Sequence, residues 1–360
     1  MPEVEILHTL SDLSKKHADE LKQIVTDDSS SVCWNWLLVQ EALCLRLGYR
    51  PCYYVLFEKN AAQALFISTV LPGIFIRKGV MKPAPIRLFL GSHPLGSSSS
   101  LFAHPSVSLE TFARLILSNP PESHLPLVSL FTAYGSTASA FEKYAEKRYI
   151  KRPWFPTAFL DTTFSSFEEY LLSLRGRWRE SIRRNIRKFE REGCTLIRVN
   201  TLEGISDKIH ELYYGVRMKY NNSPFGLDDT FFKTVEIMMQ GEMRFVIAKK
   251  REKIIGFTLI SKKKNIIAGR FVGIDYQSAK DTAVYFNLFY ETFRLAMDEK
   301  IQRVYLGISQ EDVKRRLGCR FDTPTAFLGS PSLLMSMSIR ISEPFWKGMF
   351  PKISIDSGLE

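Results

Sequence analysis

The sequence lacks cysteine pairs, long hydrophobic runs and common catalytic signatures. Its five cysteines are odd in number and form no Cys-x-x-Cys pair, so a disulfide framework and a zinc knuckle are both excluded, and we expect buried free thiols. The best apolar run, 64–76, is interrupted by Pro72 and Gly73 and is too short to span a membrane. There is no Gly-rich phosphate loop, nucleophile elbow or His-Glu-x-x-His pair. The six histidines are scattered, so we expect no metal site.

Composition describes an ordinary globular chain. The 360 residues are 45% apolar and 24% charged, which fits two domains or one large one. The first residues, Met-Pro-Glu-Val-Glu, lack the basic and apolar regions of a secretory signal, and acidic groups among the first forty residues are unlike a transit peptide. We therefore expect a cytoplasmic protein.

Positive charge is concentrated in one segment. The chain has 49 basic and 38 acidic residues, a net charge of +11, and segment 175–191 holds eight basic residues against two acidic ones. Ser166 and Glu169 form a capping box, apolar residues follow three or four apart, and Gly193 ends the pattern, so we expect an amphipathic helix, with a break at Gly176. Such a cationic face indicates an anionic partner, namely cofactor phosphates, nucleic acid or lipid head groups, unless it is only a solvated surface.

Two hairpins of similar length and apolar pattern indicate a duplicated unit. The first pairs 52–57 with 64–71, and the second pairs 244–249 with 254–261. A boundary between copies is expected near 151–156, where two prolines bracket two aromatics.

Other periodic segments complete the predicted elements. Helices are expected over 31–47, 206–220, from Asp228 or Asp229 to 240, and over 281–299. Strands are expected over 265–273 and 303–307, and the alternation of apolar residues over 335–341 predicts one more strand. Strands followed by a loop, a helix and a returning strand make an α/β (α+β) unit in which a helix N-terminus is available to an anion.

Several segments, in this order, resemble the Fem-like, peptidoglycan-biosynthesis-type branch of the GNAT acyltransferase superfamily over about 155–328. They are the basic segment 172–193, the break Ser223-Pro-Phe-Gly, the hairpin ending Ile255-Gly-Phe-Thr-Leu, the run Gly269-Arg-Phe-Val-Gly-Ile-Asp-Tyr with Tyr285-Phe-Asn-Leu-Phe-Tyr-Glu behind it, and Lys314-Arg-Arg-Leu-Gly-Cys. The resemblance implies tandem GNAT-like domains, each a mixed, mostly antiparallel sheet flanked by helices.

The resemblance also implies a division of the chain. Residues 1–150 form an N-terminal GNAT-like domain, degenerate and structural or acceptor-side; 151–330 form the catalytic copy; 331–360 form a C-terminal strand and tail. A single working cleft is expected in the second copy. There the donor enters a V-shaped opening between the strand ending near Gly273 and the strand ending at Gly307.

The activity implied is transfer of an acyl group from acyl-CoA or another thioester to an amine. The chemistry needs a deprotonated amine, a place for the oxyanion and an acid for the leaving group. Asp275, Tyr276 and Tyr285 are the catalytic candidates. The donor-binding candidates are Gly273, Lys280, Asp281, Thr282, Asn287 and Tyr290. One departure matters: coenzyme A users show Arg/Gln-x-x-Gly-x-Gly/Ala after the third strand, whereas this chain has Gln277-Ser-Ala-Lys-Asp-Thr.

The remaining candidates bind the acceptor or an anion. They are Arg183, Arg184, Arg187, Lys188, Phe225, Arg270 and Lys314. The alternative donor is aminoacyl-tRNA, as in the Fem transferases, since an arginine-rich helix suits a phosphate backbone.

Two other classes compete with the transferase. A nucleic-acid-binding protein without catalysis is disfavoured because Trp178 and Phe189 fall on the apolar stripe of the helix, where they could not stack on bases. A peripheral membrane contact is the other alternative, because the segment 345–350 is apolar and aromatic.

Overall fold

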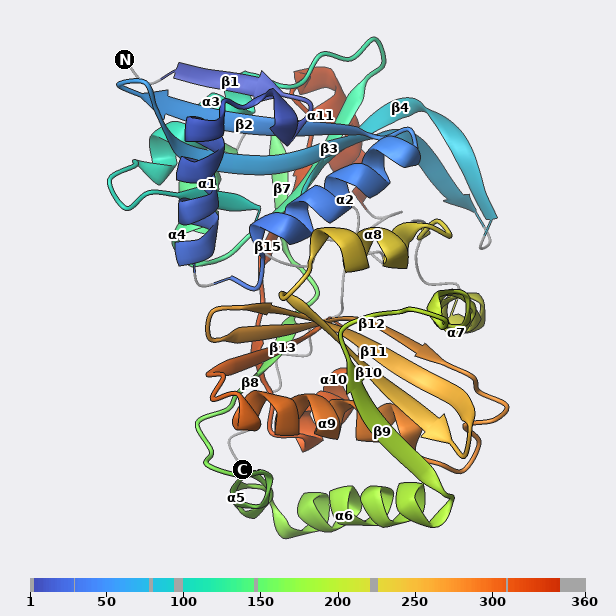
Figure 1. Ribbon diagram of the computed structural model, residues 1–360. Coiled ribbons are helices and arrows are strands. Elements are labelled where there is room, and N and C mark those ends of the chain that lie inside the picture. Colours follow the sequence, from blue (N-terminus) through green and yellow to red (C-terminus); the bar gives the residue numbers. More distant parts are fainter. Residues whose placement is uncertain are drawn as a thin grey trace. The chain divides into compact units, whose positions relative to one another are not determined.

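The computed structural model describes residues 3–28, 30–77, 80–93, 100–145, 148–220, 226–308 and 310–343, with the backbone alone for 74–84 and 220. The chain divides into two compact units (Figure 1). Unit 1 comprises Met1–Ser30, Gln40–Pro156 and Asp322–Glu360; unit 2 comprises Ser31–Val39 and Thr157–Phe321. The five cysteines are buried and free, as predicted. Among the described residues, no helix is long and apolar enough to cross a membrane.

Unit 1 is built on one mixed sheet. Its strands are β1 (Glu3–Leu7), β2 (Arg50–Glu58), β3 (Ala61–Arg77), β4 (Val80–Gly91), β5 (Leu101–Ala103), β6 (Leu127–Ala133), β7 (Tyr149–Pro153) and β15 (Thr325–Gly329). Its helices are the 3-10 turn Leu10–Asp12, α1 (Lys15–Asp27), α3 (Leu109–Ser118), α4 (Gly135–Ala145) and α11 (Leu333–Ile341), and α2 (Trp34–Arg46) begins in unit 2 and ends in unit 1.

The sheet of unit 1 has the order β1-β2-β3-β4-β6-β15-β7, with β5 beside β3. Its first four strands are antiparallel, and the predicted hairpin over 52–71 is confirmed in β2 and β3. Strands β4 and β6 are parallel neighbours and stay paired to the last residue of β4, where Gly91 pairs with Phe131. We call this fully paired parallel neighbour contact the closed step. A Cβ at Gly91 would lie 2.2 Å from the Phe131 Cβ, so this close pairing requires glycine.

Unit 2 contains the basic segment. Its strands are β8 (Thr157–Asp161), β9 (Cys194–Val199), β10 (Met243–Lys250), β11 (Lys253–Lys263), β12 (Ile266–Ile274), β13 (Arg303–Gly307) and β14 (Arg320–Asp322). Its helices are α5 (Phe167–Ser173), α6 (Gly176–Arg191), α7 (Ser206–Tyr220), α8 (Phe231–Met238), α9 (Val284–Asp298) and α10 (Glu311–Arg316).

The sheet of unit 2 repeats the plan of unit 1 in the order β14-β8-β13-β12-β11-β10-β9. Strands β9 to β12 are antiparallel, which confirms the second hairpin, and β12 to β13 is again a parallel step across a helix. The helix α7 covers one face of the sheet, and α9 with α5 and α6 lies on the other (Figure 1). Core residues from β11, β12, α9 and β13 pack together between α9 and the sheet.

The predicted amphipathic helix is present and broken where expected. The Ser166 side chain accepts a hydrogen bond from the Glu169 N–H and begins α5, which ends at Ser173, and α6 begins at Gly176. Ile182 and Phe189 are buried on α6, while the arginines lie on its outer side. The charged side of this helix therefore faces away from the core, as its sequence predicts.

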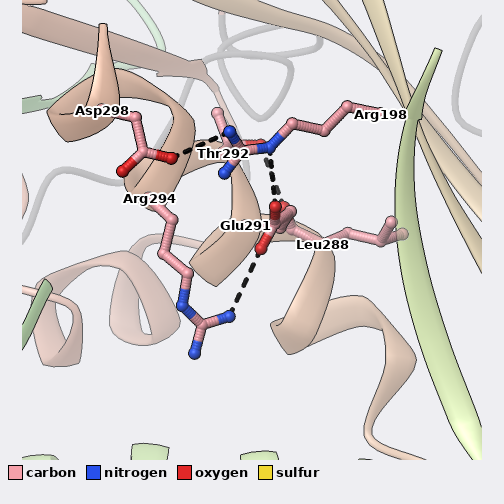
Figure 2. Close-up of polar contacts among 6 residues, drawn as sticks. All are labelled: Arg198, Leu288, Glu291, Thr292, Arg294 and Asp298. Carbon is pink, nitrogen blue, oxygen red and sulfur yellow. Dashed lines mark hydrogen bonds and ion pairs between the residues drawn. The ribbon is translucent and has the colours of Figure 1, made fainter.

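A set of ion pairs fixes α9 to the edge strand β9. Figure 2 shows Arg198 of β9 between two acids of α9: its Nε is 2.7 Å from Glu291 and one terminal nitrogen is 2.9 Å from Asp298. Arg294 approaches Glu291 from the same helix at 3.4 Å. The Thr292 hydroxyl bonds back to the Leu288 carbonyl, so it stays within α9. These contacts join the edge strand β9 to α9.

Three sequence predictions are corrected. The strand over 335–341 is wrong, because Ser332 caps a helix there, α11, whose buried side carries Ser336 and Ile339. The helix after Asp228 begins at Phe231, since the Asp228 carboxylate accepts hydrogen bonds from Thr230 and shapes the preceding turn. The predicted domain boundary at residue 150 also differs from the observed division into units. The strand β15, which follows unit 2 in the sequence, belongs to the first sheet and lies between β6 and β7. Residues 344–360 of the predicted tail lie outside the described residues.

Candidate functional site

The parallel strands β12 and β13 pair over three positions only. Ile266 to Ala268 pair with Arg303 to Tyr305, and no later pair is formed. Each strand has an irregularity at this level: Arg270 has no partner on β11, and Leu306 has none on β8. A bulge adds twist and bends a strand away from its neighbour. The strands therefore separate beyond Ala268, as the predicted V-shaped opening requires.

Arg270, predicted to bind an anion, is engaged at this bulge. Its Nε donates to the Ser261 hydroxyl at 2.7 Å, a terminal nitrogen donates to the Ser31 carbonyl at 2.6 Å, and the guanidinium lies 4.6 Å from the Trp36 ring centre. Burial lowers its pKa to about 10. These contacts attach the segment before α2 to the sheet of unit 2.

Gly273, near the end of β12, has a packing role. A Cβ there would lie 2.2 Å from the Phe257 ring and 2.8 Å from the Leu212 backbone. Glycine therefore allows α7 to approach the strand closely, and a donor role for Gly273 stays a prediction.

The turn after β12 is organised by Asp275. Its carboxylate accepts hydrogen bonds from the Gln277 and Ser278 N–H groups and forms an ion pair with Lys253 at 2.9 Å. Burial raises the pKa of Asp275, but the bonds from Lys253 and Ser278 outweigh it and hold that pKa well below its usual range. An ionised carboxylate so held cannot donate a proton near neutral pH, so its position favours a role in shaping the turn.

The two predicted tyrosines are half-buried on either side of this turn. Lys219 of α7 lies 3.5 Å from the Tyr276 ring centre. Tyr285, in the first turn of α9, packs edge-on against Phe286 and Phe289. Both stay candidates for proton transfer.

The residues that lead into α9 use left-handed backbone. Asp281 and Ala283 have φ of 66° and 56°, and Lys280 is exposed. The buried Thr282 hydroxyl donates to the Ala279 carbonyl and accepts from the Val284 N–H, so it caps the first turn of α9. Asp281 pairs with Lys188 of α6 at 3.4 Å, so two of the predicted binding residues contact each other just before α9.

Asn287 and Tyr290 join α9 to α6. The Asn287 side chain donates to the Asn185 and Ala283 carbonyls, at 3.2 and 3.0 Å. The Asn185 side chain donates to the Tyr290 hydroxyl at 3.0 Å, and burial raises the pKa of that hydroxyl to about 12. Asn287, predicted as a donor contact, is thus occupied in helix packing.

Among the basic residues of α6, three form ion pairs and two, Arg177 and Arg184, line a cavity. Arg183 pairs with Glu168, Arg187 with Glu180 and Lys188 with Asp281. Arg184 instead lines a cavity of about 510 Å³ between α6, α9 and α10. Phe225 lies outside the described residues.

Four arginines and one acid line this cavity, which we call the arginine cavity. Its walls are Arg177, Trp178, Ser181, Ile182, Arg184, Asn185, Phe286, Tyr290, Asp312, Val313, Arg315, Arg316 and Leu317. Trp178 is half-buried and lines this cavity, with the guanidinium groups of Arg175 and Arg177 at 5.2 and 5.7 Å from its ring centre. That its ring cannot stack on bases stays a prediction. The arginine pairs at 183–184 and 315–316 are the sequence signal, but only the fold shows that α6 and α10 share a cavity.

Lys314 holds the end of β13. Its ammonium donates to the Leu306, Gly307 and Ile308 carbonyls at 2.8 to 3.0 Å, and burial lowers its pKa to about 8. With three donors and three acceptors, the group is saturated. Its position therefore supports stabilising the separated strand rather than contacting an acceptor. In the described part of the chain, no cluster of His, Cys, Asp and Glu could hold a metal ion.

The two mixed sheets flanked by helices, with the separated strands of unit 2, confirm the GNAT-like fold predicted from sequence. Residues 122–321 match the model of the FemAB-like family, described as peptidoglycan biosynthesis/recognition. The chain belongs to this FemAB-like family, as its sequence resemblance implied.

Solved structures show the same fold. FemX has 10% identity and a TM-score of 0.57, with 96% of this chain and 99% of FemX covered. A conserved protein of unknown function from Bacteroides thetaiotaomicron has 10% identity and a TM-score of 0.58, with 91% and 100% covered. L-PGS from Bacillus licheniformis has 12% identity and a TM-score of 0.51, with 80% and 88% covered. No curated protein matches the chain.

Proposed function

We propose that this chain transfers an acyl group from an activated donor to an amine at the opening between β12 and β13. The observation that carries the proposal is that the two helices following the separated strands also line the arginine cavity. The helices α9 and α10, which follow the two separated strands, form two walls of that cavity. One donor can therefore place its anionic part among the arginines and direct its carbonyl toward the strands.

The acyl transfer reaction needs few catalytic side chains. The amine nitrogen bonds to the donor carbonyl carbon, the carbon–sulfur or carbon–oxygen bond breaks, and the proton lost by the amine goes to the leaving group. Backbone N–H groups of β12 that face β13 beyond Ala268 have no partner in the described β13 pairing, so they can receive the oxyanion. Tyr276 is our proposed proton carrier, and Asp275 is assigned to the turn.

The proposed donor is aminoacyl-tRNA rather than acyl-CoA. The ion pair between Asp281 and Lys188 lies just before α9. In the same place the chain lacks the motif that coenzyme A users show. The arginine cavity instead offers separated cations and, in Trp178, a ring on which a base can stack. Acyl-CoA remains the second candidate because its adenosine phosphate fits the same chemistry. The family description favours an amine of a peptidoglycan precursor as acceptor, and both donors place the reaction in the cytoplasm.

Binding to bulk aminoacyl-tRNA, coenzyme A and acetyl-CoA tests the proposal. Arg184→Glu with Arg316→Glu should weaken tRNA binding by at least about 100-fold and flatten its salt dependence, since each phosphate contact contributes about −0.9 to the log–log slope on duplex. The matched control reverses Arg114 and Lys233, which are exposed outside the cavity. Equal losses in both variants would contradict a specific cavity, and binding of coenzyme A alone would select the second donor.

A further inference from the structure

The helix α11 of unit 1 exposes an apolar stripe. Leu333, Leu334, Met337 and Ile341 are 56%, 79%, 51% and 76% exposed. At 100° per residue these four positions fall within about a quarter to a third of the helix circumference. The stripe is therefore continuous along α11, the red helix labelled in Figure 1.

The opposite face of α11 is held by small and polar contacts. The Ser336 hydroxyl donates to the Ser330 carbonyl at 2.8 Å and accepts from the Ser330 N–H, and Ile339 is buried beside it. Arg340 donates to the Tyr149 carbonyl at 3.0 Å. The helix thus buries a serine and exposes leucine, methionine and isoleucine, the reverse of an ordinary surface helix.

Basic residues lie at both ends of the stripe. Exposed Arg148 contacts the Pro331 carbonyl just before α11, and exposed Arg340 lies in its last turn. Arginine beside an apolar stripe can keep its charge in the head-group layer while its stem follows the apolar surface.

We propose that the α11 stripe docks on an anionic lipid surface. The four aliphatic side chains form a continuous apolar stripe, which matches the shallow burial of an interfacial helix. The arginines at its ends supply attraction to anionic head groups. This docking stands independently of the transfer reaction.

Vesicle co-sedimentation of the full chain tests this docking. Equimolar phosphatidylcholine–phosphatidylglycerol vesicles should bind the chain, and phosphatidylcholine vesicles should bind it several-fold less. Replacing Leu334, Met337 and Ile341 by serine should weaken binding by about tenfold or more, because the affinity follows the apolar area buried. The matched control replaces Leu172, Met218 and Ile237 of unit 2, which are 62%, 64% and 64% exposed, by serine and should bind as the unchanged chain does. Thermal unfolding of each variant confirms that it is folded.

Three results would overturn the proposal. They are no binding of the unchanged chain to anionic vesicles, equal binding by both triple variants, and equal binding to neutral vesicles. A dimer that the α11 variant converts to a monomer, without any vesicle binding, would identify a second copy as the occupant instead.

Discussion

The two units share one sheet plan but differ at its parallel step. In unit 1 the strands β4 and β6 pair over five positions, to the last residue of β4. In unit 2 the strands β12 and β13 pair over three and then separate between two bulges. The arginine cavity is lined by α6 and by α9 and α10, the helices that follow the two separated strands. The parallel strands of unit 1 thus form a closed step, which serves stability. The parallel strands of unit 2 form an open step, because they separate, and this is where we propose catalysis.

Among single substitutions at neutral pH, the largest loss of stability should come from disturbing the paired strands β4 and β6. Gly91→Ala places a Cβ 2.2 Å from that of Phe131, so we expect a loss of about 3 kcal/mol in the free energy of unfolding. Gly269→Ala, at the open step, meets only the Tyr305 carbonyl at 3.6 Å and should change stability by less than about 1 kcal/mol. Urea unfolding measures both, and equal costs would contradict the difference between the steps.

Mild acid should destabilise unit 1 through His93. This histidine is fully buried among Tyr53, Thr69 and Cys44, and burial lowers its pKa to about 3 from 6.5. Below pH 6.5 the unfolded chain binds a proton at this histidine that the folded chain does not bind. The free energy of unfolding therefore falls by up to about 1.4 kcal/mol per pH unit as the pH is lowered to 3. Urea unfolding at several pH values should show this slope in the unchanged chain.

The variant His93→Gln should lose that part of the slope, whereas His124→Gln, at an exposed position, should keep it. An unchanged slope in His93→Gln would show that other groups cause the acid sensitivity.

Lys314 keeps the open step of unit 2 in place. Lys314→Met would leave three carbonyls of the β13 end without their donor, and we expect a cost of about 2 kcal/mol. Lys280→Met, at an exposed lysine of the same unit, should cost less than about 0.5 kcal/mol. Chemical denaturation compares the two, and a neutral Lys314→Met would contradict the role given to this ammonium.

The smallest effect should come from the outer side of α6. Arg187 and Glu180 are 63% and 57% exposed, so Arg187→Ala should change stability by no more than about 0.5 kcal/mol. Thermal unfolding at low and high salt checks this. A loss above 1 kcal/mol would mean that the basic helix serves folding more than binding.

Local signals predicted most elements, and distant packing explains the errors. The Ser166 cap, the turns of both hairpins and the apolar period of α7 are encoded within a few residues. The alternation over 335–341 misled because Leu333, Met337 and Ile341 are also spaced for a helix, with the apolar stripe outward. Nothing local shows that β15 returns to the first sheet.

The opening after β12 follows from strand order and family resemblance. Arg184, predicted from charge density to bind an anion, lines the arginine cavity, and its binding role stays a prediction. The engagement of Lys314, Asn287 and Arg270 depends on partners far away in the sequence, so residue type alone could not reveal it. The sequence did not identify Trp178 as a cavity residue, because the spacing of apolar residues along a helix does not show how deeply each side chain is buried.

Hydrogen exchange with and without bulk aminoacyl-tRNA shows whether the donor binds at the separated strands of unit 2. We expect slower exchange over 177–185, 269–274 and 312–317 and no change over 87–91 and 127–131. Protection of the closed step in unit 1, with none at the open step, would contradict this expectation.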